Sequence, residues 1–273
     1  MISNITDIVQ LAIKEDVGTG DVSADLIEES VSTANITSKD NAVICGIEYA
    51  NEAFYQIDKK LVINWSVKDG SKVFNRQSIC SIHGSSRSII SAERVALNFL
   101  QTLSSTATKT RLLVDKISHT KAKLLDTRKT IPGLRLAQKY AVKCGGGVNH
   151  RMGLYDCVMV KENHIMRLGS ISSAVELAID KHPKLPLIVE IEDLNQLNEA
   201  LKIKGIKRIL CDNFTNDMLQ IAVEMAKDIT PLEASGNIDE NNIIDIAETG
   251  VGYISIGAIT KNISAIDLSL RFT

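Results

Sequence analysis

The sequence lacks several features that would point directly to a class of partner. Its 273 residues carry a formal net charge of only −2, so no charge imbalance favours nucleic acid or an anionic membrane. No uninterrupted apolar run reaches the roughly 18 residues that a membrane span requires. The start of the chain is charged at Lys14, Glu15 and Asp16, unlike the apolar region of a signal peptide. We therefore expect a soluble, cytoplasmic protein that binds neither nucleic acid nor membrane.

Cysteine is scarce and irregularly spaced. The chain has five cysteines, and none forms a C-x-x-C pair. This spacing indicates neither a common zinc motif nor a disulfide framework. We expect five reduced cysteines in the core of a cytosolic protein.

Three familiar catalytic motifs are also missing. There is no Gly-x-x-x-x-Gly-Lys-Ser/Thr loop, which disfavours an ordinary nucleoside triphosphatase. There is no G-x-S-x-G elbow, which disfavours a serine hydrolase. No dinucleotide-binding fingerprint follows the first strand expected in the second half of the chain.

The first part of the chain predicts a small α/β domain. Hydrophobic residues make up 44% of the sequence, enough for a sizeable core in one large or two modest domains. Helical spacing predicts a first helix that ends near Gly18. Residues 35–81 contain short β-branched segments separated by turns, which predict a small sheet. A long helix is predicted over 91–110, and the domain boundary is placed near it.

The second part has a regular alternation of strands and helices. Each of the three later helices begins at a candidate N-cap, namely Asp193, Thr215 and Asp239. A strand–helix–strand repeat of about 22 residues predicts parallel βα units. We favour an incomplete barrel of the TIM type over a doubly wound sheet. The predicted strands are 123–125, 157–160, 187–191, 208–211, 230–233 and 253–256.

Polar or backbone-exposing residues recur at the same position of four successive units. Glu190, Asp212, Ser235 and Gly257 each stand at the end of a predicted strand, 22 or 23 residues apart. Ligands of parallel α/β proteins bind at the carboxyl ends of the strands. Helix caps and turn glycines would explain one such residue but hardly four in phase, so we predict a ligand site there.

Basic residues follow the earlier strands. Arg128 and Lys129 come just after the strand at 123–125, and Lys161 just after the strand at 157–160. Between them three glycines at 145–147 precede Arg151, and their exposed N–H groups could cradle an anion. Such a set suits a ligand with several negative groups and a ribose, for example a diphosphorylated sugar with an aromatic dicarboxylate.

These segments resemble the quinolinate phosphoribosyltransferases, and the resemblance covers nearly the whole chain in family order. The residues that carry it are 15–21, 93–100, 126–135, 139–164, 189–192, 212–213, 232–236 and 254–258. The resemblance implies an α/β fold with an N-terminal α/β sandwich domain over 1–105. It also implies an incomplete TIM-like α/β barrel over 106–273, with the last few residues packing back on the N-terminal domain.

The resemblance further implies an activity and a set of site residues. The reaction is phosphoribosyl transfer from 5-phosphoribosyl-1-diphosphate to quinolinate, giving nicotinate mononucleotide, CO2 and pyrophosphate in NAD biosynthesis. The family is dimeric, so a homodimer is expected in which Arg94 is contributed across the interface. The residues matched to the quinolinate site are Arg94, Arg128, His150, Arg151 and Lys161. The expected catalytic residues are Lys129, Glu190 and Asp212, of which Glu190 and Asp212 also hold Mg²⁺, directly or through water. The remaining substrate-binding residues are Thr127, Ser235, Gly236 and Gly257.

Two other functions stay open at this point. One is a relative of the same fold that uses another pyridine or purine acceptor, or a molybdenum-associated relative. The other is a non-catalytic barrel that only binds anionic sugars or scaffolds a partner. The four cations Arg94, Arg128, Arg151 and Lys161 argue against the first, because a ligand with two carboxylates would need that many. The acidic residues Glu190 and Asp212 argue against the second, because carboxylates in a phosphate-binding site make sense chiefly with a metal ion or a developing positive charge. The chain departs from the usual family pattern at Glu162, Asn237 and Gly252.

Overall fold

The computed structural model describes residues 5–273, and their contacts divide the chain into two units. The first unit comprises the residues up to 111 together with 131–146 and 262–273. The second comprises 112–130 and 147–261. The predicted boundary after residue 105 falls within a continuous helix, α3 (Ser86–Lys116).

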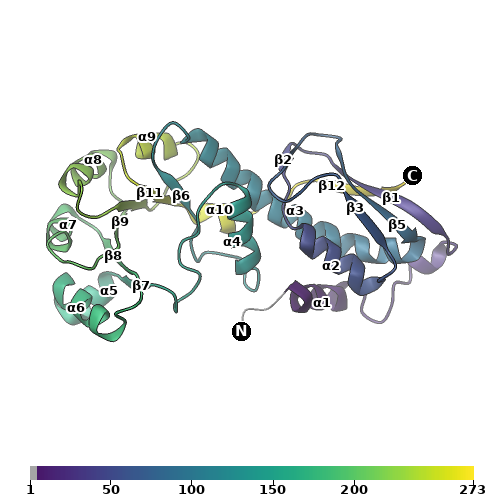
Figure 1. The fold of residues 1–273 in the computed structure, drawn as a ribbon, viewed down its shortest axis with the longest axis horizontal. Helices are drawn as coiled ribbons and strands as arrows, with labels where there is room; N and C mark the ends of the chain where they lie inside the picture. The colour runs from purple at the N-terminus through teal and green to yellow at the C-terminus, as the bar shows by residue number, and fades with distance from the viewer. Residues whose placement is uncertain (1–4) are drawn as a thin grey trace. The chain divides into compact units, whose positions relative to one another are not determined.

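The first unit is built on an antiparallel sheet in the order β12-β1-β5-β3 (Figure 1). Its long central strands, β1 (Val31–Ser38) and β5 (Ser78–Ser85), pair from Val31 with Ser85 to Thr37 with Ser78. The chain returns at its end to add β12 (Leu268–Phe272) beside β1. The other strands of the unit are β2 (Ala42–Val43), β3 (Val62–Trp65) and β4 (Lys72–Val73).

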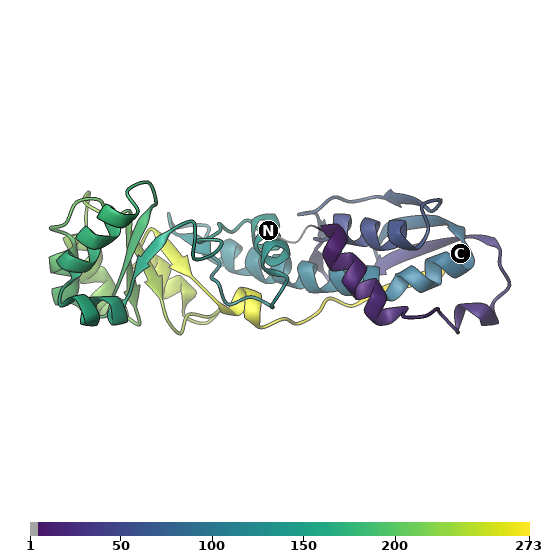
Figure 2. The same ribbon diagram turned by 90° about the horizontal axis from the view of Figure 1, so that it is seen from below.

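Two helices cover one face of this sheet and complete its core. Ile36 of β1 and Ile82 of β5 are fully buried against α2 (Ile47–Ile57) and α3, where Phe54 and Leu100 are also fully buried. Alternate residues of a strand face opposite sides, so one face of each strand supplies the core. Helix α1 (Ile5–Asp16) packs against α2 (Figure 2). The last helix of the unit is α4 (Arg135–Cys144).

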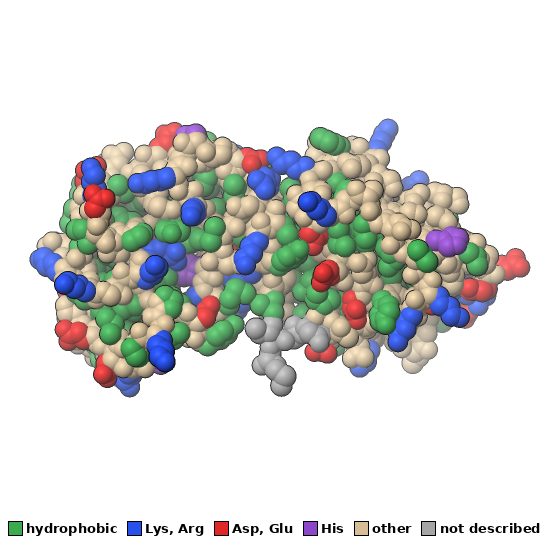
Figure 3. Space-filling view, in the orientation of Figure 1, with side chains coloured by type: hydrophobic (Ala, Val, Ile, Leu, Met, Phe, Trp, Pro, Cys, Tyr) green, Lys and Arg blue, Asp and Glu red, His purple; other side chains and the backbone are tan. Residues whose placement is uncertain are grey.

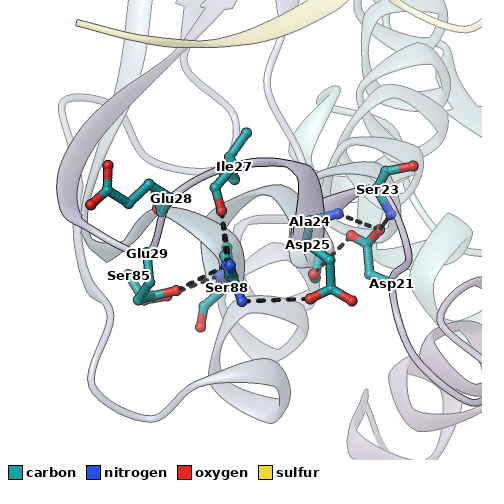
Figure 4. A network of polar contacts seen from close by, with 12 residues as sticks. Asp21, Ser23, Ala24, Asp25, Ile27, Glu28, Glu29, Ser85 and Ser88 are labelled. Atoms are coloured by element: carbon teal, nitrogen blue, oxygen red, sulfur yellow. Dashed lines mark hydrogen bonds and ion pairs between the residues drawn. The ribbon is translucent and has the colours of Figure 1, made fainter.

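A turn stabilised by Asp21 follows the first helix. Its carboxylate accepts hydrogen bonds from the backbone N–H groups of Ser23 and Ala24 at 2.9 and 3.0 Å (Figure 4). It also accepts a hydrogen bond from the Ser91 hydroxyl at 2.9 Å. These bonds lower the pKa of Asp21, with the Ala24 N–H contributing most. The acidic residue of this glycine-rich segment therefore serves the fold of the first unit.

The second unit is a curved parallel sheet with helices on its outer side (Figure 1). Its strand order is β6-β11-β10-β9-β8-β7, so the edge strands of the sheet in the described residues are β6 and β7. This arrangement confirms the predicted incomplete barrel. The strands are β6 (Lys123–Leu125), β7 (Val158–Val160), β8 (Leu187–Ile191), β9 (Arg208–Asp212), β10 (Leu232–Ser235) and β11 (Tyr253–Ser255). The helices are α5 (Glu162–Leu168), α6 (Ile171–Lys181), α7 (Leu194–Ala200), α8 (Asn216–Met225), α9 (Ile243–Glu248) and α10 (Ala258–Lys261).

Two of the three predicted helix caps are confirmed. Asp193 accepts a hydrogen bond from Gln196 N–H, and Thr215 accepts one from Met218 N–H. The prediction of Asp239 was wrong, because α9 begins three residues later, after Asn242. The carboxylate of Asp239 instead accepts a hydrogen bond from the backbone N–H of Asn241 in the preceding turn.

The strand register brings the polar strand ends together. Ser235 of β10 lies beside Asp212 of β9, and Glu190 of β8 lies beside Leu210 of β9. Since alternate residues share a face, Glu190, Asp212 and Ser235 lie at one edge of the parallel sheet. No described helix is long and apolar enough to cross a membrane. On the face drawn in Figure 3, acidic and basic side chains are interspersed.

Candidate active site

Two adjoining cavities open at the carboxyl ends of the second unit's strands. One has a volume of about 370 Å³ and the other about 340 Å³. They share a wall, whose residues are Thr127, Lys129, Asp212, Ser235 and Ser255. Two molecules bound in the two cavities would therefore meet at this wall. Such an arrangement suits a pair of substrates that react with each other.

Basic side chains gather in the smaller cavity. Arg128, Arg151, Lys161 and His150 all line it. Burial, followed by the like charge of Arg128, lowers the pKa of the Arg151 guanidinium. Arg151 donates a hydrogen bond to the backbone carbonyl of Cys157 at 3.2 Å, which fixes its direction. A partly desolvated pair of guanidinium groups favours an anionic ligand, because planar carboxylates match the fork of arginine.

Lys161 and Glu190 form a close ion pair in the same cavity. Lys161 Nζ donates to Glu190 Oε2 at 2.5 Å. Burial raises the pKa of Glu190, Lys161 opposes this shift, and the charge of Asp212 adds to the rise. Lys161 stands at the start of α5, and its backbone N–H donates to His164 Nδ1 at 3.1 Å. Together with Asp212, the pair presents a lysine and two carboxylates at neighbouring strand ends.

His150 is held by two buried carboxylates. Its backbone N–H donates to Asp126 Oδ1 at 2.8 Å, and its Nε2 lies 3.4 Å from Glu233 Oε2. Arg208 Nε lies 2.7 Å from the same Glu233 oxygen, as an ion pair that lacks the alignment of a hydrogen bond. Burial raises the pKa of Glu233, but His150 and Arg208 outweigh it and the net pKa is lowered. The imidazole is therefore positioned by the fully buried carboxylate of Glu233, which also pairs with the largely buried Arg208.

The larger cavity needs two glycines at its wall. A Cβ on Gly257 would come within 2.8 Å of Lys129 Cδ and 3.3 Å of Thr127 Oγ1. Gly236 has a φ of +97°, and a Cβ there would come within 2.2 Å of Asn213 Oδ1. Both positions leave backbone exposed to the cavity, as a phosphate group requires.

The loop after β6 carries Lys129 between the two cavities. The Lys129 N–H donates to Thr127 Oγ1 at 3.0 Å, and its carbonyl accepts from the Thr260 hydroxyl at 2.7 Å. Both main-chain groups are thereby fixed, while the side chain reaches the shared wall. Lys261, at the end of α10, adds a second lysine to the larger cavity.

Comparison with known proteins decides the family. The model of the N-terminal domain of quinolinate phosphoribosyl transferase matches residues 16–104, and that of the C-terminal domain matches 106–271. The chain belongs to the quinolinate phosphoribosyltransferase family. It is 38% identical to quinolinate phosphoribosyltransferase [decarboxylating] 1b of Nicotiana tabacum, over 98% of this chain and 82% of that protein.

Bacterial relatives agree with this assignment. The chain is 38% identical to the probable nicotinate-nucleotide pyrophosphorylase [carboxylating] of Bacillus subtilis, over 95% of this chain and 90% of that one. The structure of the nicotinate-nucleotide pyrophosphorylase from Francisella tularensis superposes with a TM-score of 0.97 at 48% identity. That match covers 98% of this chain and 96% of the other. Fold and sequence therefore identify the same family of phosphoribosyltransferases.

Eleven of the twelve predicted site residues lie around the two cavities of this quinolinate phosphoribosyltransferase family member. Those on the smaller one are Thr127, Arg128, Lys129, His150, Arg151, Lys161, Glu190, Asp212 and Ser235. Gly236 and Gly257 line the larger one. The twelfth, Arg94, belongs to the first unit, where it is 56% exposed on α3 and 3.8 Å from Glu93. The roles of all twelve stay predictions.

The triple glycine has a different part in the structure from the anion cradle that its sequence suggested. A Cβ on Gly145 would come within 2.5 Å of the Ala107 carbonyl and the Thr110 Cβ, so Gly145 permits close packing of α4 on α3. Neither cavity has any of the three glycines in its lining. Residues that the sequence analysis missed are Glu233, Ser255, Asn213 and Lys261, all of which line a cavity. A charged residue within the apolar run of β10 was the available signal for Glu233.

Proposed function

We propose that this chain carries out the reaction named for its relatives: phosphoribosyl transfer from 5-phosphoribosyl-1-diphosphate to quinolinate, with decarboxylation to nicotinate mononucleotide. The observation that carries the proposal is the cation cluster of Arg128, Arg151 and Lys161 beside Glu190 and Asp212 in one cavity. Quinolinate brings two carboxylates on a planar ring, and phosphoribosyl diphosphate brings the phosphates that suit the adjoining cavity. Five free cysteines fit the reducing cytoplasm, where we place the reaction.

Quinolinate binds in the smaller cavity in this proposal. Arg128 and Arg151 hold its carboxylates with forked hydrogen bonds, and Lys161 adds a third cation. Met159 and Leu210 supply an apolar surface for the pyridine ring. His150 is fixed by Asp126 and Glu233, and its Nδ1 accepts a hydrogen bond from the Arg151 N–H at 2.7 Å, so it supports Arg151 at the wall of the cavity.

The phosphoribosyl group lies along the shared wall. The 5′-phosphate fits the larger cavity, where Gly236 and Gly257 leave backbone exposed and Ser235 and Lys261 also line the wall. Lys129, between the cavities, is suited to the diphosphate. Its backbone is fixed, and its long, exposed side chain can follow the leaving group.

The pyridine nitrogen then attacks the anomeric carbon as the bond to diphosphate breaks. The departing oxygen takes the bonding electrons, and positive charge develops on the ribose. Glu190 and Asp212 stabilise that charge, while Lys129 stabilises the diphosphate. In the resulting pyridinium, the bond to the 2-carboxylate breaks and CO2 leaves, while the bonding electrons stay on carbon 2, stabilised by the adjacent positive nitrogen. A proton then takes its place on carbon 2. Positioning supplies most of the catalysis, and no covalent enzyme intermediate is needed.

A Mg²⁺ ion is part of the proposal. Glu190 and Asp212 end adjacent strands and line the same cavity, and the charge of Asp212 contributes to the raised pKa of Glu190. Two neighbouring carboxylates fit a hard cation such as Mg²⁺, and Glu190 and Asp212 would hold it, directly or through water. When bound, the ion would supply positive charge that offsets the charge of the diphosphate.

We further propose a homodimer in which Arg94 completes the partner's quinolinate site. Two features support this assignment. The Arg94 side chain is 56% exposed, whereas that of its neighbour Glu93 is only 25% exposed. Burial accordingly raises the pKa of the Glu93 carboxyl group. An exposed arginine on an otherwise well-packed helix is available for contact with a second chain.

The proposal is tested by the products. Purified protein is incubated with phosphoribosyl diphosphate, Mg²⁺ and either quinolinate or nicotinate, and nicotinate mononucleotide is followed by mass spectrometry. Product from quinolinate alone, lost with EDTA and restored by added Mg²⁺, is the expected result. Product from nicotinate alone would mean that the cation cluster does not recognise two carboxylates.

A further inference from the structure

Two cysteines and an aspartate from three separate segments converge in the first unit. The sulfurs of Cys45 and Cys144 and a carboxylate oxygen of Asp69 all lie within 4.8 Å of one another. Cys45 is fully buried, whereas Cys144 and Asp69 are partly exposed. Among the described residues this is the one such group of potential metal ligands, and it contributes to neither cavity of the second unit.

Hydrogen bonds of the backbone hold the segments that carry Cys45 and Asp69. Gly70 N–H donates to the Ile44 carbonyl at 2.8 Å, which joins the segment of Asp69 to that of Cys45. The hydroxyl of Ser104 accepts from Cys45 N–H at 2.9 Å and donates to the Cys45 carbonyl at 3.2 Å. The position of Cys45 is therefore set on both sides, by the strand pairing and by α3.

Of the three ligand atoms, one oxygen of Asp69 has a clear role in the fold. Asp69 Oδ1 accepts hydrogen bonds from the N–H groups of Gly46 and Ile47 at 3.0 and 3.2 Å, at the start of α2. This capping role does not require two thiols nearby.

We propose that Cys45, Cys144 and Asp69 bind a borderline-soft divalent cation of the class of Zn²⁺. Around tetrahedral zinc, with bonds of about 2.3 Å to sulfur and about 2.1 Å to oxygen, neighbouring ligand atoms are roughly 3.5–3.8 Å apart. The distances between the three ligand atoms, which are at most 4.8 Å, need to shorten by only about 1 Å to reach that geometry. Two sulfurs disfavour Mg²⁺, which takes oxygen ligands, and water completes the fourth position.

The bound ion joins the end of α4 to the turn that precedes α2. Cys144 is the last residue of α4, and the chain reaches His150 six residues later. The site goes beyond the proposed function, because its ligands take no part in the chemistry. Sequence spacing gave no indication of it, since Cys45 and Cys144 are 99 positions apart and neither belongs to a C-x-x-C pair.

The test uses full-length protein freed of metal and kept reduced with a phosphine. Titration with Co²⁺ should saturate at one equivalent, with a sulfur-to-cobalt charge-transfer band that added Zn²⁺ abolishes. Cys144→Ser should lose at least half of the band intensity and weaken cobalt binding at least tenfold. Asp69→Asn should also weaken binding, although its amide oxygen can still cap α2. Cys80→Ser, at a buried cysteine of β5 outside the group, is the matched control and should behave as wild type.

Two results would overturn the proposal. One is the absence of a charge-transfer band at saturating cobalt, or a band of full intensity in Cys144→Ser. The other is a native mass spectrum of the reduced protein, after incubation with one equivalent of Zn²⁺, that shows the mass of the protein alone with no bound zinc. Both deciding variants change partly exposed residues, so the test does not depend on replacing the buried Cys45.

Discussion

Lys161 Nζ donates a hydrogen bond to Glu190 Oε2, so the cation proposed for quinolinate is also the partner of a carboxylate proposed to be catalytic. The two side chains come from the ends of adjacent strands, β7 and β8. In the protein without substrate, each charge compensates the other. In the proposed complex, Lys161 is shared between Glu190 and a carboxylate of quinolinate.

Replacing Lys161 by alanine should weaken recognition of quinolinate. A charge-assisted hydrogen bond contributes about 1.5–3 kcal/mol, so kcat/KM for quinolinate should fall roughly 10- to 150-fold. Steady-state kinetics with each substrate varied in turn measures the effect. Lys204→Ala, at an exposed lysine of the same unit, should have no effect. A loss confined to the KM of phosphoribosyl diphosphate would contradict the assignment of Lys161.

Replacing Gly257 by alanine should impair the phosphate cavity with little cost to folding. The new Cβ would lie 2.8 Å from Lys129 Cδ, and a flexible lysine side chain can move away. Lys129 would then leave its position at the shared wall, and we expect KM for phosphoribosyl diphosphate to rise about tenfold, or about 1.4 kcal/mol. Gly252→Ala is the matched control, since its Cβ meets only the Leu232 carbonyl at 3.7 Å. Equal kinetics for the two variants would contradict the prediction.

Replacing Glu233 by glutamine should destabilise the protein and disturb His150. The change leaves the charge of Arg208 without its buried partner, at a cost of about 3–5 kcal/mol. Urea unfolding measures this loss, with Glu240→Gln on the exposed surface as control. KM for quinolinate should rise as well. Unchanged stability would mean that the ion pairs of Glu233 carry no net free energy.

The same variant should show a defined pH dependence. The pKa of Glu233 is lowered in the folded protein, so its contribution to stability is present above the unfolded value of about 4.3. That contribution is lost as the pH falls through the folded-state value. The difference in unfolding free energy between wild type and Glu233→Gln should therefore shrink below about pH 4. A difference that stays constant on acidification would contradict the sign of this shift.

Mixing two inactive variants should restore activity if Arg94 acts across a dimer interface. Arg94→Ala and Lys129→Ala should each be inactive alone. After subunits exchange, half of the dimers are mixed and each carries one intact site, so about one quarter of wild-type activity is expected. Native mass spectrometry of differently tagged chains verifies the exchange. Verified exchange without recovered activity would show that Arg94 serves its own chain.

Local patterns predicted the second unit well because each βα unit repeats the same sequence signals. The strands 123–125 and 187–191 were predicted with their observed bounds, since each contains consecutive apolar residues, at 124–125 and at 187–189. The strand at 230–233 was predicted too early. Pro231 cannot donate a backbone hydrogen bond, and β10 instead extends to Ser235, which pairs with Asp212.

Features that depend on distant partners were harder to predict. The strand β12 pairs with β1, more than 200 residues earlier, and no local pattern in Leu268–Phe272 indicates that pairing. The long helix α3 was predicted over 91–110 but spans Ser86–Lys116, because packing at both ends overrides the polar residues there. Glu233 was missed for the same reason, because its role depends on His150 and Arg208, which come from distant parts of the sequence.

The central claim is that transfer to quinolinate and loss of its 2-carboxylate occur on this protein as one process. The most direct measurement uses quinolinate labelled with ¹³C in the 2-carboxylate, with phosphoribosyl diphosphate and Mg²⁺, and quantifies labelled CO2 against nicotinate mononucleotide. We predict one labelled CO2 for each nucleotide, and neither product from Lys129→Ala. Unlabelled CO2, or a nucleotide that retains both carboxylates, would contradict the account.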